Sequence, residues 1–443
     1  MKHIFVKNIY LHQLRHLEKL IIPINSGKMN HLILTGKNGS GKTSVLNEIK
    51  FFIDLLLKQN FDQEMNFKID SLISLINEIL ALDKEIDYKL LNPSIQSNEI
   101  KLQELKDYKD QSKIMIERFD KYYNDFNFKK DKLNLILSTN LNFFNLKTEF
   151  ENGNYIFAHF SAKRSFNTYD VKSPQKIDLP EIFDSSQHGN ELFLQYLVNQ
   201  QVQLLYAKAD NDIKTIQDIE SWFKKIRSVF REIFEDESLE LIYDRDNYEF
   251  KFKTQNRVEF DFNTLSDGFS SILGIIAEII IRMERKSSKI YKLNGLVLID
   301  ELETHLHISL QRKVLRILTT LFPNLQFIVT THSPFILNSI ENAVVYDMEY
   351  RETIQDLTRY STEALVENYF ESNKYSEVLL NKIKQYEYLL SSKVNSEKQI
   401  DEIIELKKYF DDLPLINSKE MELKLNMLNL DYKDKIENLI QND

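Results

Sequence analysis

The chain has 443 residues, with 57 basic and 67 acidic side chains and a formal charge of −10. This length allows a large core and more than one structural lobe. A hydrophobic fraction of 42% argues against global disorder. The chain has no cysteine, which excludes disulfides and thiolate chemistry and leads us to expect a cytoplasmic protein. No apolar run approaches the roughly 20 residues that span a bilayer, so we expect no membrane partner. With this charge, nucleic acid could bind only at a local basic patch.

The glycines of this chain concentrate in one loop. There are 9 glycines, where an average usage of about 7% would give about 31, and three of them fall within six residues. The loop Gly36–Thr43 reads GKNGSGKT and matches G-x-x-x-x-G-K-[ST] at every fixed position. It follows a predicted buried strand, His31–Thr35, and precedes a predicted helix, Ser44–Leu57. This arrangement points backbone N–H groups and a helix N-terminus at one anion, which we expect to be a nucleotide phosphate.

Two side chains of the loop have predicted roles. Lys42 would reach the β- and γ-phosphates, and the Thr43 hydroxyl would bind Mg²⁺. The alternative, a glycine-rich turn without a ligand, is disfavoured by the complete pattern and by both flanking elements. The predicted phosphate-binding residues are Gly36, Lys37, Asn38, Gly39, Ser40, Gly41, Lys42, Thr43 and Ser44.

A helical insertion is predicted after the first helix. Between Gly41 and Gly153 the chain has no glycine, and Pro93 is the one proline there. Over about 54–140, apolar residues recur at helical spacing, which predicts two long helices that meet near Pro93. We expect a short coiled-coil arm, and a compact helical lobe is the alternative.

The next predicted elements lead to a second helix N-terminus. A strand over Tyr155–His159 is followed by a helical block, Glu191–Glu235, and by a hairpin, Leu239–Phe262. The tetrapeptide Leu265–Gly268 (LSDG) then precedes an apolar helix, Phe269–Ile281. Its serine is a suitable N-cap, and its glycine allows a close backbone approach, so a simple capped helix is one interpretation.

Two acidic residues end the next predicted strand, Gly295–Asp300 (GLVLID). Asp300 would hold Mg²⁺ at the strand end, and Glu301 would accept a proton from the attacking water. The alternative is that both carboxylates cap a helix starting near Thr304.

A last strand, Gln326–Thr331, is closed by His332. This histidine can reach a γ-phosphate, or it can simply hydrogen-bond to backbone at the strand end. A zinc set with His305 and His307 is disfavoured, because those two side chains would point to different faces.

The order of these motifs resembles the ATP-binding-cassette (ABC) heads of the RecF, SMC and OLD group. It most resembles the AAA15/AAA21-type ATPases of bacterial anti-phage systems, which include PtuA of Septu and AriA of PARIS. The segment Ile9–Ile24 is similar to the N-terminal hairpin of that group. The resemblance implies an α/β fold, with a P-loop ABC-ATPase head over 1–50 and 155–350. A helical, coiled-coil-like insertion would occupy 51–154 and a helical C-terminal region 351–443.

The resemblance also implies roles for the motifs. By similarity, Gly36–Thr43 is the Walker A motif and Asp300-Glu301 the Walker B motif with the general base. It places the D-loop at Glu303–His305 and suggests Phe160–Arg164 as the Q-loop. The remaining implied site residues are the signature residues Ser266, Asp267 and Gly268 and the switch histidine His332. The implied activity is ATP hydrolysis with Mg²⁺.

Two functions follow from the resemblance. In the first, ATP joins two heads into a homodimer or higher oligomer, and this sensor or regulatory subunit of an anti-phage system controls a separate effector nuclease. In the second, the chain is a RecF/SMC-like repair or chromosome-maintenance ATPase that binds duplex DNA. Residues 351–443 carry 13 Lys/Arg and 19 Asp/Glu, a net charge of −6. This region is a solvated face or a docking surface for a basic protein, and a poor surface for DNA.

Overall fold

The computed structural model describes four long stretches, 3–58, 134–164, 189–284 and 293–354, with gaps at 25–26 and 256–257. It also describes short parts of 71–118 and 166–183, residue 357, and most of 377–436. The chain divides into two compact units, Met1–Tyr360 and Ser361–Asp443, and each is described by itself. Most of the predicted coiled-coil arm, with its turn near Pro93, lies outside the described residues.

The central sheet of the first unit has six strands in the order β12-β11-β3-β10-β9-β5. The five strands from β11 to β5 are parallel, and β12 is an antiparallel edge strand. Parallel strands covered on both faces are apolar throughout, and every residue of β3, β9 and β10 is buried. The carboxyl ends of these strands therefore share one edge. The strands are β3 (His31–Thr35), β5 (Tyr155–Phe160), β9 (Asn294–Ile299), β10 (Leu325–Thr330), β11 (Ala343–Asp347) and β12 (Glu352–Ile354).

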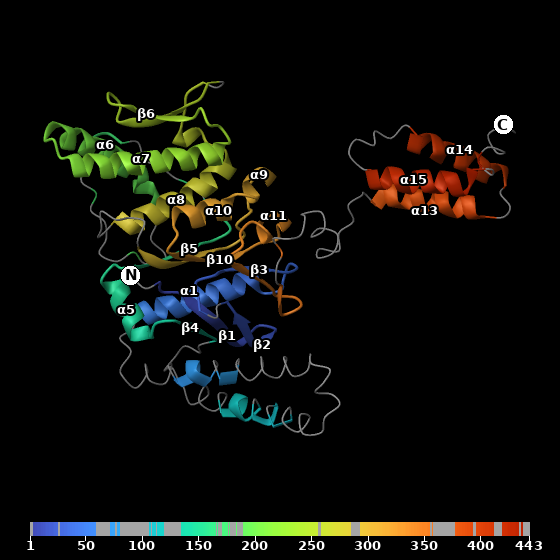
Figure 1. The fold of residues 1–443 in the computed structure, drawn as a ribbon, viewed down its shortest axis with the longest axis horizontal. Helices are drawn as coiled ribbons and strands as arrows, with labels where there is room; N and C mark the ends of the chain where they lie inside the picture. Colours follow the sequence, from blue (N-terminus) through green and yellow to red (C-terminus); the bar gives the residue numbers. More distant parts are fainter. Residues whose placement is uncertain are drawn as a thin grey trace. The chain divides into compact units, whose positions relative to one another are not determined.

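A second, antiparallel sheet in the order β2-β1-β4 packs on helix α1 (Lys42–Lys58). It contains β1 (Val6–Leu14), β2 (Leu17–Pro23) and β4 (Leu135–Thr139). Figure 1 shows α1 between the two sheets, and buried residues of all three layers form one core.

Both predicted boundaries of the insertion, 51 and 154, change because of this packing. Helix α1 continues past residue 50 to Lys58, with Phe52 and Leu56 buried in the same core. The helical insertion was expected to extend to residue 154, but β4 pairs with β1, and Leu146 and Phe150 of α5 (Phe143–Glu151) are buried in the same core. Residues 135–151 therefore belong to the head.

The other face of the central sheet carries a mainly helical layer (Figure 1). Its long helices are α6 (Phe193–Ala209), α7 (Ile213–Phe234) and α8 (Asp267–Glu284). Phe193, Phe230 and Phe252 pack with Phe262 just before α8, and so fix where that helix begins. Its small elements are β6 (Glu240–Asp244), β7 (Glu249–Lys253), β8 (Phe260–Asp261), the 3₁₀ turns Asn190–Leu192 and Phe262–Thr264, α9 (Ile308–Gln311), α10 (Val314–Leu321) and α11 (Pro334–Leu337).

The second unit contains three described helices, α13 (Glu377–Ser391), α14 (Glu397–Asp411) and α15 (Lys419–Asp431). Each contributes to a separate apolar core, which includes Tyr386 and Phe410. The helical C-terminal region was expected to begin at residue 351, but β12 (Glu352–Ile354) pairs with β11 in the central sheet, and the first unit extends to Tyr360.

Candidate nucleotide-binding site

The glycine-rich loop connects the carboxyl end of β3 to α1. Gly36, Gly39 and Gly41 have φ values of 125°, 85° and 101°, which other residues rarely adopt. A Cβ on Gly41 would lie 2.9 Å from Leu17 Cδ1, so space as well as conformation requires glycine there. The loop has this shape because the sequence supplies glycine at all three positions.

Lys42 is buried at the first turn of α1, and its Nζ donates to the carbonyl oxygens of Gly36 (2.7 Å) and Lys37 (3.0 Å). Burial lowers the pKa of Lys42, and the nearby charges of Glu303, Glu301, Asp300 and Asp347 oppose that shift. The Ser40 hydroxyl is also buried and has no hydrogen-bond partner among the described residues. The loop therefore offers a cation and an unused polar group to an anion.

Asp300 lies at the edge of the sheet next to the loop. Its Oδ1 accepts hydrogen bonds from the Thr43 hydroxyl (3.1 Å) and the Thr330 hydroxyl (2.6 Å). The Thr330 hydroxyl in turn accepts one from Glu301 N (2.7 Å). Thr330 therefore fixes both acidic residues. Thr330 was not predicted as a site residue, although it ends β10, the strand beside β9.

Glu301 has a left-handed backbone, with φ of 46°. For a residue other than glycine this costs about 1–3 kcal/mol, and it persists only where the surrounding structure holds it in place. No helix begins near Thr304: residues 301–305 form turns, and α9 begins at Ile308 with His307 as its N-cap. The alternative in which the two carboxylates cap a helix is therefore wrong.

His332 follows β10, and its backbone N–H donates to Glu303 Oε1 at 2.5 Å. Glu303 Oε2 is buried without a partner among the described residues. Burial, and then the charge of Lys42, lower the pKa of His332, so its imidazole is neutral at neutral pH. Glu303, predicted only as part of a D-loop, is thus a third carboxylate of the site, beside Asp300 and Glu301.

The predicted signature lies at the start of α8. The side chains of Ser266 and Asp267 are exposed. Gly268 packs against the turn after Glu301, where an added Cβ would lie 2.6 Å from His305 O. The structure thus joins Gly268 to the D-loop of its own chain and leaves the other two side chains at the surface.

Arg164 follows β5, within the segment suggested as a Q-loop. Its guanidinium donates to the carbonyl oxygens of Asp300 (2.8 Å), Glu301 (3.1 Å) and Leu302 (3.1 Å). Its Nε donates to the Ser271 hydroxyl on α8 at 2.7 Å. Arg164 therefore contacts both the acidic turn and the signature helix.

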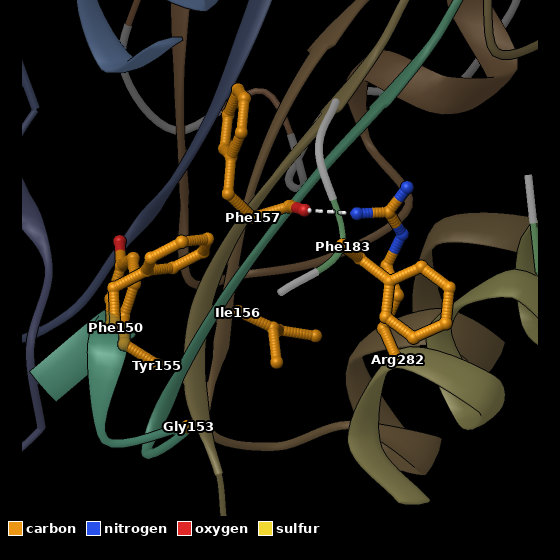
Figure 2. Close-up of a pocket in the computed structure, with 7 residues that line it drawn as sticks. All are labelled: Phe150, Gly153, Tyr155, Ile156, Phe157, Phe183 and Arg282. Atoms are coloured by element: carbon orange, nitrogen blue, oxygen red, sulfur yellow. Dashed lines mark hydrogen bonds between the residues drawn. The ribbon is translucent and has the colours of Figure 1, made fainter. Parts of the chain in front are cut away.

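A cavity of about 20 Å³ lies elsewhere, beside β5, and Figure 2 shows its lining. Arg282 borders it and donates to Phe157 O at 2.9 Å. This volume holds about one water molecule and is too small for a nucleotide. Its lining residues are Phe150, Gly153, Tyr155, Ile156, Phe157, Phe183 and Arg282.

The residues of the loop fit ATP with Mg²⁺. The unpartnered Ser40 hydroxyl and the Lys42 ammonium suit phosphate oxygens, and the Thr43 hydroxyl and Asp300 carboxylate are oxygen ligands of the kind that Mg²⁺ prefers. Two protein oxygens are typical where substrate phosphates complete the ligand set. In the described part of the chain no group of three His, Cys, Asp or Glu side chains could hold a metal, which also disfavours the zinc set.

The family model AAA_21, described as "AAA domain, putative AbiEii toxin, Type IV TA system", matches residues 32–338. The chain belongs to the AAA_21 family. It is an ATPase of the P-loop type, and the α/β fold that we predicted is confirmed by the parallel sheet and the phosphate loop. Among the described residues, no helix is long and apolar enough to cross a membrane.

This AAA_21 chain is similar to curated proteins and to solved structures. It is 23% identical over 457 residues to "Retron Vc95 probable ATPase" of Vibrio cholerae serotype O1 biovar El Tor. This match covers 87% of this chain and 83% of the relative. It is 30% identical over 191 residues to "Septu protein PtuA" of Bacillus thuringiensis. This match covers 41% of this chain and 46% of that protein. The "SMC head domain from Thermotoga maritima" is 12% identical, with a TM-score of 0.33, and the match covers 77% of this chain and 94% of that structure.

Proposed function

We propose that this AAA_21 ATPase is the regulatory or sensor subunit of an anti-phage defence system, and that ATP-dependent pairing of two heads controls a separate effector nuclease. The relatives support the biological setting, since their names place them in a retron and in Septu. The resemblance of the motifs to AAA15/AAA21-type ATPases of anti-phage systems supports a nuclease as the protein that this ATPase controls. The proposal for pairing rests on the signature residues.

The observation that carries the pairing is the exposure of Ser266 and Asp267 at the N-terminus of α8. A helix N-terminus attracts anions, and Gly268 beside them is already packed on the chain's own His305. The free side of this N-terminus is thus available to the phosphates bound by a second head. Because the two sites of such a dimer are shared, ATP stabilises the pair and hydrolysis releases it.

Within each site the residues have the following proposed roles. Lys42 and the loop N–H groups bind the β- and γ-phosphates, and Thr43 and Asp300 hold Mg²⁺, which neutralises phosphate charge. Glu301 accepts the proton of the attacking water. The neutral His332 contacts the γ-phosphate, and Thr330 fixes the direction of Asp300 and of the Glu301 backbone.

The test of pairing uses two variants. Glu301→Gln should bind ATP, hydrolyse it about 10²–10⁴-fold more slowly, and accumulate as a dimer or higher oligomer in size-exclusion chromatography with light scattering. If Glu301→Gln hydrolyses ATP at the wild-type rate, Glu301 is not the base. If it stays monomeric with ATP bound, the pairing proposal fails.

A mixing experiment tests whether the site is shared. Lys42→Ala and Ser266→Arg should each be inactive, and mixing them should restore part of the activity, because one site of a mixed dimer keeps both an intact loop and an intact signature. Ser266 is the better signature position to change, since Gly268 also packs on its own chain. No recovery despite demonstrated subunit exchange would count against a shared site. ATP-dependent binding of duplex DNA would favour the repair-type function instead.

A further inference from the structure

Arg164 has an unusually complete set of partners. All five guanidinium N–H groups of an arginine can donate, and here they reach four backbone carbonyls and one hydroxyl. Besides the contacts already described, Nη1 donates to Ser161 O at 3.2 Å. Three of the carbonyls belong to the consecutive residues Asp300, Glu301 and Leu302.

We propose that Arg164 is a positioning residue that couples the signature helix α8 to the direction of the Glu301 side chain. The proposal rests on the proposed function, since it takes Glu301 as the base. Arg164 would not touch the phosphates itself. Its hydrogen bonds connect the signature helix α8 to the backbone of Glu301 in the same chain.

Arg164 holds the backbone of the acidic turn, Asp300 to Leu302, in a sharp bend. Three consecutive carbonyl oxygens converge on one guanidinium only if the backbone turns sharply, and the left-handed φ of Glu301 supplies that turn. A left-handed residue persists where its surroundings determine it strongly. Arg164 on one side and the Thr330 hydroxyl on Glu301 N provide this support. The backbone held in this way determines where the Glu301 carboxylate points.

Helix α8 contacts Arg164 through a serine side chain. Ser271, which accepts from Arg164 Nε, lies three residues after Gly268 and is buried. The neighbouring Ser270 hydroxyl instead accepts from Phe166 N at 3.1 Å. We expect α8 to move when its N-terminus binds the nucleotide of a second head. Such a movement would displace Arg164 through Ser271 and Phe166 through Ser270.

Arg164 keeps its positive charge although it is largely buried. Burial is the main cause that lowers the pKa of Arg164, to about 10, while the nearby Glu303, Asp300 and Glu301 oppose the shift. The guanidinium therefore stays cationic at neutral pH. Among the described residues Arg164 forms no ion pair with these carboxylates within 4.0 Å, so its bonds to the backbone carbonyls are the contacts that define its place. A lysine has three donors and cannot replace all five bonds.

The experiment is a double-mutant cycle on the full-length protein. Arg164→Ala should lower kcat about 10- to 100-fold, the scale expected when a reacting group is misplaced by about 1 Å, with ATP affinity by calorimetry changed less than about threefold. In the Glu301→Gln background the same substitution should change kcat less than about twofold, because the base that Arg164 positions is already absent. Arg164→Lys should restore part of the lost activity.

A pair of adjacent serines provides the matched control. Ser271→Ala removes the bond from α8 to Arg164 and should lower kcat about threefold, while Ser270→Ala should leave kcat unchanged. These variants keep the proposal testable if Arg164→Ala does not fold, which thermal unfolding will show.

The outcomes are distinct. Wild-type kcat in Arg164→Ala, an equal loss in both backgrounds, or equal kcat values for the two serine variants would overturn the proposal. Wild-type turnover of Glu301→Gln would instead refute the proposed base itself.

Discussion

At the scale of single residues, Lys42 is a buried cation, and we propose that it binds the phosphates. We predict that Lys42→Ala abolishes ATP binding in calorimetry, because the β- and γ-phosphates lose their loop cation. Lys50→Ala, a change eight residues further along α1, is the matched control and should leave the affinity within about twofold. Undiminished affinity of Lys42→Ala would refute the phosphate-loop assignment.

Thr330 gives a second prediction at this scale. Thr330→Val keeps the shape of the side chain but removes the hydroxyl that bonds Asp300 and Glu301 N. A hydrogen bond to a charged group contributes about 1.5–3 kcal/mol, so kcat should fall at least about tenfold, and the Mg²⁺ concentration for half-maximal activity should rise. Steady-state ATPase assays over a range of Mg²⁺ will measure both. Thr330→Ser should behave like the wild type, and wild-type kinetics in Thr330→Val would exclude the role.

The residues that the sequence could predict are those that follow one another along the chain. Gly36–Thr43 and Asp300-Glu301 are local patterns, and the structure brings them together as expected, with Thr43 and Asp300 in hydrogen-bond contact. Thr330 and Glu303 contact site residues that are distant in sequence or lie across a turn. These contacts depend on the register between β9 and β10 and on the left-handed turn at Glu301. Neither feature can be predicted from the spacing of residues in a motif.

At the scale of elements, α8 carries a titratable group at its C-terminal end. Burial raises the pKa of Glu284 to about 7 from an ordinary value of 4.5, and the Tyr196 hydroxyl that donates to it opposes part of that shift. Between these two pH values the folded state keeps a proton that the unfolded state has lost. Glu284 therefore makes the protein less stable as the pH rises from about 4.5 to about 7.

This linkage predicts the behaviour of Glu284→Gln. Glutamine cannot ionise, and its carbonyl can still accept the Tyr196 hydrogen bond. The variant should be more stable than the wild type at pH 8, by about 1–3 kcal/mol, and the difference should shrink as the pH falls toward 5. Urea unfolding at the two pH values measures it. The same difference at both values would contradict the role of Glu284.

The elements were predictable where their patterns are long or strongly flanked. The strands β3, β9 and β10 and the helices α1 and α8 occur where the sequence indicates them. The strand β4 was not predicted, because its five residues, LILST, lie in a stretch with apolar residues at helical spacing, and a short apolar run fits a strand or a buried helix equally well. Only the pairing with β1 distinguishes the two.

At the scale of the whole molecule, the separation into two units predicts the result of a truncation. A chain ending at Tyr360 should retain ATPase activity, since every nucleotide motif and its core lie in the first unit. The three helices of the second unit share a core of their own. If the acidic residues after 351 are a docking surface for the proposed effector nuclease, the truncated protein should lose co-purification with that nuclease. If it captures that nuclease at full strength, the docking surface lies elsewhere, and the insertion is the next region to test.

Helix α1 gives the head a mechanical property. It begins at Lys42, where the phosphates are proposed to bind, and it ends at Lys58, within the stretch for which the sequence predicts a helical insertion. Its 17 residues span about 26 Å at 1.5 Å per residue, and its middle is held between two sheets that share one core with it. A helix packed on both sides in this way is stiff, so we expect a displacement of its phosphate end on nucleotide binding to be transmitted along α1 toward the residues that follow Lys58.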